Sequence, residues 1–233
     1  MRIALLSNPS SGRGRHAAAD DVARRILTEA GHEVLHVRGS SYEQARDAGR
    51  ALLGDGPHRN VEALVVVGGD GMVHLGVDVV ATTGVPLGIV ATGTGNDIAR
   101  HFGLPSRDAE ASARLINQAL SGKGAITAVD AIYASRPDGT LLAPQRRWSL
   151  AVVSAGVDAA VNARANTLSW PAGEGRYVRA FTAELATLAP YGYRVTTEEG
   201  AWEGPALLLA AANTRYVGGG MDLARARAAA DGA

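Results

Sequence analysis

A glycine-rich turn near the middle of the chain carries the residues that most directly suggest chemistry. Gly68-Gly69-Asp70-Gly71 directly follows the apolar run of residues 64–67. An unbroken β-branched run is typical of a strand buried on both faces of a parallel sheet, and the spacing of Val73, Val77 and Val80 predicts a helix after the turn. Strand, glycine turn and helix in this order aim backbone N–H groups at an anion, and glycine lets the backbone approach a bulky ligand. The turn therefore favours phosphate binding, with Asp70 orienting a metal ion or water; the alternative is a tight turn with a solvated aspartate.

A second glycine-rich turn repeats this design about twenty residues further on. Gly93-Thr94-Gly95-Asn96-Asp97 follows the apolar run of residues 87–90, and a short helix is expected at residues 97–102. Asp97 supplies a second carboxylate that can help neutralise charge around a phosphate. The repetition supports the interpretation of the first turn as part of a phosphate site.

The first expected strand, residues 2–6, also ends in a polar turn. Asn8, Ser10 and Ser11 lie in this turn, and their side chains and the free N–H groups around them are suited to contact phosphate. A plain Asn-Pro turn is the alternative interpretation.

The same turn contains a formal match to a dinucleotide fingerprint, Gly12-x-Gly14-x-x-Ala17. Arg38, at the end of the next expected strand (33–37), would suit the 2′-phosphate of NADP. The fingerprint requires its first glycine directly after the strand, whereas residues 7–11 intervene here. An isolated match of this kind is weak, and no P-loop sequence occurs.

The amino-acid composition excludes several classes of protein and of site. Basic and acidic side chains balance at 23 each, which argues against bulk nucleic-acid binding. The absence of cysteine excludes disulfides, zinc–thiolate sites and thiol catalysis, and agrees with a reducing cytoplasm. No apolar run approaches the ~18 residues of a membrane span. Met1 leads into a strand rather than a signal peptide, so we expect a cytoplasmic protein without a transmembrane segment.

The expected elements divide the chain into two parts. Strands alternating with helices predict an α/β domain with a parallel sheet over residues 1–124. Its later helices are expected at residues 42–53, 73–82 and 97–102 and from the cap Asp108 to Leu120. Beyond residue 125, strands are expected at residues 126–134, 148–154, 193–197 and 206–212, with one helix at 176–188. The predicted fold class is therefore α/β, with an incomplete, mostly antiparallel β-rich domain over residues 125–233.

Taken together, the turns resemble those of the diacylglycerol kinase catalytic family, which includes bacterial lipid kinases and sphingosine kinases. Five motifs match in order: Asn8-Pro-Ser-Ser-Gly12, Gly68-Gly-Asp-Gly71, Gly93-Thr-Gly-Asn-Asp97, Asn213 with Gly218-Gly-Gly-Met221, and Asp231-Gly232. The resemblance covers the whole chain, and the ordered set is far more specific than any one motif.

The resemblance implies an ATP site between two domains, with Asp70 as the catalytic candidate. It assigns nucleotide contacts to Asn8, Pro9, Ser10, Ser11, Gly12, Ser40, Gly69, Asp70, Gly71, Met72, Val73, His74 and Thr94. It also assigns a structural magnesium ion to Asp231, and Asp130 either joins that magnesium network or is a plain strand-edge carboxylate.

The sequence departs from the family pattern at several positions. Gly39 stands where the family often has threonine, with Ser40 and Ser41 adjacent as substitutes. Met72 replaces another threonine, and His74-Leu75 replaces an Asn-Glu pair. The family's general base lies in a later Asp-Gly-Glu motif, which these 233 residues do not reach, so this chain by itself is expected to be inactive.

The function expected from the resemblance is Mg²⁺-dependent transfer of phosphate from ATP to the hydroxyl of a diacylglycerol-like lipid. Such an enzyme would be cytoplasmic, would associate transiently with the membrane surface that carries its lipid substrate, and would not bind nucleic acid. The resemblance leaves open whether the protein forms a homodimer. The alternatives are an NAD kinase-like enzyme, which shares the Gly-Gly-Asp-Gly turn, and a non-catalytic nucleotide- or lipid-binding remnant.

Overall fold

The computed structural model describes residues 1–7, 15–39, 41–54, 60–136, 138, 140, 148–171, 175–185 and 188–222. The chain forms two compact units, one made of residues 1–151 together with the returning segment that begins at Ala212, and the other of Val152–Ala211. Contacts between residues define these two units. The sequence instead predicts a boundary near residue 125, where the expected strands change from parallel to antiparallel. That boundary stays a prediction.

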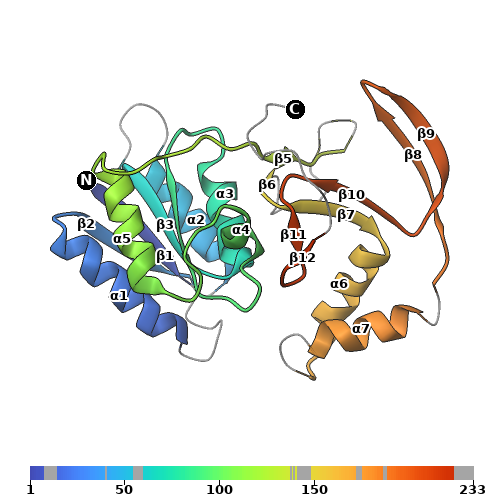
Figure 1. The fold of residues 1–233 in the computed structure, drawn as a ribbon, viewed down its shortest axis with the longest axis horizontal. Coiled ribbons are helices and arrows are strands. Elements are labelled where there is room, and N and C mark those ends of the chain that lie inside the picture. The colour runs from blue at the N-terminus through green and yellow to red at the C-terminus, as the bar shows by residue number, and fades with distance from the viewer. Residues whose placement is uncertain are drawn as a thin grey trace. The chain divides into compact units, whose positions relative to one another are not determined.

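A four-stranded parallel sheet forms the centre of the first unit (Figure 1). In spatial order its strands are β2 (Glu33–Arg38), β1 (Arg2–Ser7), β3 (Ala63–Gly68) and β4 (Leu87–Ala91). Every residue of β3 is buried, as its unbroken apolar run predicts for a strand covered on both faces.

Helices cover both faces of this sheet. They are α1 (Arg15–Glu29), α2 (Tyr42–Leu53), α3 (Asp70–Val80), α4 (Asp97–His101) and α5 (Ala109–Leu120). Alternate side chains of β3 serve two separate cores, because successive strand residues point to opposite faces. Leu64 and Val66 pack with α2 and α3, whereas Val65 and Val67 pack with α1 and α5.

Side-chain caps begin two of the helices, and the sequence predicts one of them, Asp108. The Asp108 side chain accepts a hydrogen bond from the Ala111 N–H (2.9 Å) and begins α5. Ser41 caps α2 in the same way through the Gln44 N–H (3.2 Å), and Gly54 ends α2 with φ of 68°. Both helices therefore have the bounds expected from the sequence.

The remainder of the chain contains short antiparallel strands and two helices. The antiparallel pairs are β5 (Ile132–Tyr133) with β6 (Trp148–Ser149), β8 (Tyr191–Thr197) with β9 (Gly200–Ala206), and β11 (Tyr216–Val217) with β12 (Met221–Asp222). A further two-stranded sheet joins β7 (Val152–Gly156) and β10 (Leu208–Ala212). The predicted α/β class, with a parallel sheet followed by antiparallel strands, is confirmed.

Several details of this half differ from the sequence prediction, including the strands β9, β11 and β12, which were not predicted. The strand expected at residues 126–134 is limited to β5, and residues 126–131 have no regular structure. The helix α6 (Val157–Thr167) was not predicted, whereas α7 (Gly175–Leu185) was. Only Val161 and Ala165 of α6 are buried, so its apolar face is too narrow to produce a clear helical period. Among the described residues, no helix is long and apolar enough to cross a membrane.

Candidate functional site

The order of the strands determines where a ligand can bind this sheet. β1 lies between β2 and β3, so the connections that follow β1 and β3 leave toward opposite sides of the sheet. Ser7 at the end of β1 pairs with Val67 near the end of β3, so the turns after both strands begin at the same edge. In open parallel sheets ligands bind outside the carboxyl ends of the strands at such a switch point.

The Gly-Gly-Asp-Gly turn is shorter than the sequence suggested. The helix was expected from residue 73, but α3 already begins at Asp70 with Gly69 as its N-cap. The N–H groups of Met72 and Val73 both donate to the Gly69 carbonyl (2.9 and 3.2 Å). Asp70 and Gly71 therefore occupy the first turn of a helix, where the helix dipole favours a carboxylate or a bound anion.

The two glycine turns lie directly against each other. A Cβ atom on Gly93 would lie 2.5 Å from the Gly69 Cα, and a Cβ atom on Gly69 would lie 3.2 Å from the Gly93 Cα. The approach at Gly93 is closer than real Cβ atoms come to a backbone, so the contact requires glycine at that position. The Thr92 N–H donates to the Gly68 carbonyl (2.9 Å) and continues the pairing of β3 with β4 into the turns.

The Asp70 carboxylate lies at the junction of these turns. Its Oδ1 accepts a hydrogen bond from the Ile98 N–H in α4 (3.2 Å), which fixes its orientation. Its Oδ2 faces Gly95, where a Cβ atom would lie 3.1 Å away. Asp70 is half-buried, and among the described residues no donor bonds Oδ2. One oxygen is thus held by the protein while the other can contact a cation or water.

Asp97 has a different role, because both of its oxygens have protein partners. Oδ1 accepts from the Arg100 guanidinium (2.7 Å), and Oδ2 accepts from the Gly219 N–H (2.8 Å). The side chain is largely buried. We interpret Asp97 as the residue that attaches the turn of residues 218–220 to α4. Of the two carboxylates that the sequence suggested for charge neutralisation, Asp70 is the one with an oxygen free to act.

The turn of residues 218–220 reaches the site only because it consists of glycine. Gly218, Gly219 and Gly220 have φ values of 63°, 90° and 106°, a left-handed conformation that side chains disfavour. A Cβ atom on Gly220 would lie 2.7 Å from the Arg100 guanidinium. The Arg100 guanidinium also lies 5.8 Å from the centre of the Tyr216 ring. The motif of residues 218–221 therefore packs closely on α4.

Asn213, another member of the matched motifs, has a structural role. Its side-chain amide donates to the carbonyls of Asp130 (2.7 Å) and Leu150 (3.1 Å), and its N–H donates to the carbonyl of Ala151 (2.9 Å). This side chain joins the returning segment to the stretches around β5 and β6.

Asn96 lies inside the second turn in a left-handed conformation, with φ of 53°. Its amide nitrogen donates to the Gly93 carbonyl and the Ser106 hydroxyl, both at 2.9 Å. Its buried Oδ1 accepts no hydrogen bond in the part of the chain that the structure describes. A buried acceptor in this position suits an ordered water.

The predicted contact residues on α3 and in the second turn lie in different environments. Gly71 and Thr94 are exposed and His74 is half-buried. Met72 and Val73 are buried in the core between the sheet and α3, so their side chains support the turn from behind. The remaining predicted residues, Asn8, Pro9, Ser10, Ser11, Gly12, Ser40 and Asp231, lie outside the described residues.

Arg107 supports the second turn and was not predicted from the sequence. Its guanidinium donates to the carbonyls of Thr94 (2.7 Å) and Gly93 (3.4 Å). Its backbone has φ of 60° and its N–H donates to the Ala91 carbonyl (2.7 Å). An arginine between Pro105 and the helix cap Asp108 follows no recognisable pattern, so only the folded chain reveals this contact.

Among the described residues, no group of three or more histidine or acidic side chains is placed to hold a metal ion. Magnesium does not need such a group, because it usually keeps several waters and takes one or two carboxylates together with substrate phosphates. Asp70, with one free oxygen in a glycine-lined helix start, fits such an ion. No described residue tests the structural magnesium assigned to Asp231.

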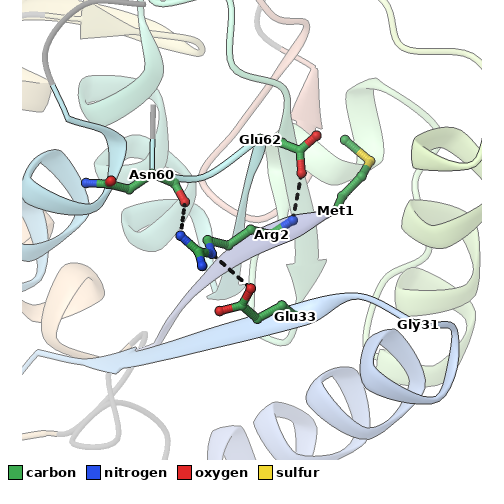
Figure 2. Close-up of a pocket in the computed structure, with 6 residues that line it drawn as sticks. All are labelled: Met1, Arg2, Gly31, Glu33, Asn60 and Glu62. Carbon is green, nitrogen blue, oxygen red and sulfur yellow. Dashed lines mark hydrogen bonds and ion pairs between the residues drawn. The ribbon is translucent and has the colours of Figure 1, made fainter. Parts of the chain in front are cut away.

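A hollow at the opposite edge of the sheet is lined by Arg2 and by two glutamates that bond to it (Figure 2). Arg2, at the start of β1, donates through its guanidinium to Glu33 (3.0 Å) and through its N–H to Glu62 (2.8 Å). These residues lie at the amino ends of the strands, away from the glycine turns. Since Arg2 already bonds to both glutamates, we do not assign a ligand to this hollow.

Known proteins resemble this chain in both fold and sequence. Residues 2–134 match the model of the diacylglycerol kinase catalytic domain, and residues 151–233 match a model described as the YegS C-terminal NAD kinase beta sandwich-like domain. A crystal structure of a diacylglycerol kinase from Bacillus anthracis has a TM-score of 0.61 at 20% identity, covering 95% of this chain and 67% of that one. At this identity the likeness shows the fold alone.

Relatives in sequence define the family. A diacylglycerol kinase from Mycobacterium tuberculosis is 35% identical over 222 residues, which are 94% of this chain and 67% of that protein. A probable lipid kinase of YegS type from Stenotrophomonas maltophilia is 31% identical over 170 residues, 70% of this chain and 51% of that protein. The chain thus falls in the lipid kinase class of families. It belongs to the diacylglycerol kinase catalytic-domain family, as the ordered motifs predicted.

Proposed function

We propose that the protein transfers a phosphoryl group from ATP to the hydroxyl of a diacylglycerol-like lipid at a membrane surface, with Mg²⁺ as cofactor. The observation that carries this proposal is the Asp70 carboxylate at the start of α3. One of its oxygens is fixed by the Ile98 N–H, and the other faces the second glycine turn. The names of the relatives supply the lipid acceptor, and the family supplies the reaction class.

Phosphoryl transfer requires positioning and charge stabilisation more than covalent participation of the protein. Here the paired glycine turns bring two stretches of backbone together without intervening side chains. The start of α3 contributes the positive end of a helix dipole. Asp70 would hold the magnesium ion through Oδ2; the ion, when bound, neutralises the charge of the phosphates. Arg107 keeps the second turn in place through two carbonyls.

The direct test is an acceptor-panel assay on the full-length protein. Labelled ATP and Mg²⁺ would be supplied with diacylglycerol, monoacylglycerol and sphingosine in mixed micelles, and with NAD⁺ in solution. We expect label to enter phosphatidic acid, and to do so only with Mg²⁺. Label that entered NAD⁺ alone would contradict the proposal and favour an NAD kinase-like activity.

Ligand preference gives a second test that does not require turnover. Because a ligand stabilises the folded state that binds it, Mg-ATP should raise the melting temperature more than NADPH at equal concentration. The physical reason is the pair of glycine turns, which suits phosphates, whereas the dinucleotide fingerprint has a misplaced first glycine. Thermal shift measurements over matched concentration series check this. A larger shift with NADPH would restore the dinucleotide interpretation.

Gly71 offers a test of where the nucleotide lies. A Cβ atom on Gly71 would meet no atom of a neighbouring segment within 4 Å among the described residues, and Gly71 occupies the first turn of α3. Gly71→Ala should therefore leave the melting temperature unchanged or raise it, because alanine is the better helix former by roughly 0.5–1 kcal/mol. The new methyl group would project into the space that we assign to phosphate, so affinity for ATP should fall at least about tenfold, the loss expected for roughly 1.4 kcal/mol. Unchanged affinity would place the nucleotide elsewhere.

A further inference from the structure

Arg107 fixes the orientation of two peptide groups in the second glycine turn. Its Nη2 donates to the Thr94 carbonyl (2.7 Å), and its Nε donates to the Gly93 carbonyl (3.4 Å). The Gly93 carbonyl also accepts from the Asn96 amide (2.9 Å). In the described part of the chain, the Thr94 carbonyl accepts from Arg107 alone. The orientation of the peptide between Thr94 and Gly95 therefore depends on this one side chain.

The two N–H groups of these peptides point away from Arg107. A trans peptide group is planar, so its carbonyl and its N–H point in opposite directions. Because Arg107 holds the carbonyls of Gly93 and Thr94, the N–H groups of Thr94 and Gly95 lie on the opposite face of the turn. Neither N–H donates to an acceptor among the described residues. Successive free N–H groups of this kind form a concave site for an anion.

The peptide that Arg107 alone holds lies beside the Asp70 carboxylate. A Cβ atom on Gly95 would lie 3.1 Å from Asp70 Oδ2, the oxygen that we assign to magnesium. Donors beside this oxygen suit the phosphates that accompany such an ion. Glycine at position 95 lets the peptide rotate readily, because both signs of φ are accessible to glycine. Without Arg107 the peptide is free to turn its carbonyl oxygen, which repels phosphate, to the face where the N–H now lies.

The backbone of Arg107 also supports a role at this site. Its φ of 60° is a left-handed conformation that arginine rarely adopts. Its N–H donates to the Ala91 carbonyl (2.7 Å), and the preceding Ser106 pairs with Ala91 as an isolated bridge. These contacts attach Arg107 to the end of β4, beside the turn that its side chain holds. Unfavourable backbone conformations of this kind are concentrated at functional sites.

We propose that Arg107 is a positioning residue for ATP, which presents the N–H groups of Thr94 and Gly95 to a phosphate of the nucleotide. This inference rests on the proposed function, because its ligand is the nucleotide of that reaction. The property required of Arg107 is its planar guanidinium, which donates from two nitrogens to two carbonyls. A positive charge at this position is not sufficient.

Two substitutions separate the geometry of Arg107 from its charge and from stability. Arg107→Lys keeps the charge but offers a single nitrogen, which does not reproduce the paired contacts of the guanidinium. Arg107→Asn removes both contacts and the charge, and asparagine adopts the left-handed conformation more readily than arginine. Because Arg107 is exposed, we expect the melting temperature of Arg107→Asn to stay close to or above that of the wild type.

The experiment measures the Kd of a fluorescent ATP analogue with Mg²⁺ for the full-length wild type and for both variants. Arg114→Asn is the matched control, because Arg114 lies on α5 with a side chain that is 64% exposed and pairs with Glu110. We expect the Kd to rise at least about tenfold in Arg107→Asn and at least about fivefold in Arg107→Lys, within the range produced by displaced binding groups. The Kd of Arg114→Asn should stay within about twofold of the wild type.

Hydrogen exchange of single amides, followed by NMR, supplies a readout that a purely structural residue would not change. Mg-ATP should slow the exchange of the Thr94 and Gly95 amide protons in the wild type, because both groups then donate to phosphate. In Arg107→Asn at saturating nucleotide, the slowing should be lost at Gly95, whose orientation depends on Arg107 alone. It should partly remain at Thr94, because Asn96 still holds the Gly93 carbonyl.

The outcomes distinguish the inference from the proposed function. Equal Kd values for the wild type and both Arg107 variants would overturn the positioning role while leaving the proposed function intact. Wild-type affinity in Arg107→Lys, with weaker binding in Arg107→Asn, would overturn it in favour of simple charge attraction. A fall in the melting temperature of Arg107→Asn that accounts for its weaker binding would overturn it in favour of a structural role. Failure of the wild type itself to bind the analogue would overturn the proposed function, and the inference with it.

Discussion

Asp70→Asn is expected to reduce ATP-dependent phosphorylation of diacylglycerol at least about 100-fold, the scale on which a key electrostatic group contributes. Asparagine keeps an oxygen that can accept from the Ile98 N–H, so the turn should retain its geometry. What the variant loses is the negative charge on the oxygen that faces Gly95. The measurements are kcat with diacylglycerol in mixed micelles and the melting temperature, which should hardly change.

A surface aspartate provides the control for this variant. Asp47 on α2 has a side chain that is 64% exposed, so Asp47→Asn should keep both kcat and melting temperature near the wild-type values. If Asp70→Asn retained near-normal kcat, Asp70 would be a turn residue and the proposed site would lose its central member. A loss of kcat accompanied by a fall of many degrees in melting temperature would point to unfolding rather than chemistry.

Gly93→Ala is expected to separate the two glycine turns. Its methyl group would have to fit 2.5 Å from the Gly69 Cα and 2.9 Å from the Asn96 Oδ1, so backbone rather than a flexible side chain must move. Overpacking of this kind typically costs about 1–3 kcal/mol. We expect a lower free energy of unfolding by that amount, together with weaker ATP binding, because the turns are where phosphate is proposed to bind.

Gly71→Ala is the comparison that isolates the cause. It adds the same methyl group in the neighbouring turn, where no other segment of the described chain comes within 4 Å, so stability should not decrease. Denaturant unfolding of both variants measures the difference. Equal stabilities for Gly93→Ala and Gly71→Ala would mean that the backbone of the turns can move to accommodate the added methyl group. Close packing of the two turns would then not be required for this site.

The parallel sheet and its glycine turns are predictable because local sequence determines them. The apolar run of β3 ends abruptly at glycine, and the cap Asp108 and the break at Gly54 define helix ends within a few residues. Each signal involves neighbours in sequence, so no knowledge of the fold is needed to recognise it. The sequence prediction placed the start of α3 three residues too late, because Asp70 and Gly71 have low helix propensity. In the folded chain, the N-cap position of Gly69 and the packing of α3 on the sheet outweigh that propensity.

The contacts that complete the site are less predictable because they join distant parts of the chain. Nothing near Asp97 in the sequence indicates that its carboxylate accepts from Gly219, and nothing near Arg107 indicates that it holds the carbonyl of Thr94. Pairings of this kind depend on the tertiary fold, which local patterns do not encode.

The first compact unit is discontinuous in sequence, and this has a consequence for synthesis on the ribosome. Its sheet is complete after β4, but Asn213 and Gly219 are translated only after the whole of Val152–Ala211. Domains generally fold as units in the order in which they emerge during translation. The nascent chain can therefore form the parallel sheet early, while Asp97 still lacks its partner from Gly219. An mRNA truncated just after codon 151 would yield a chain with the sheet and both glycine turns, but with one flank of α4 left open.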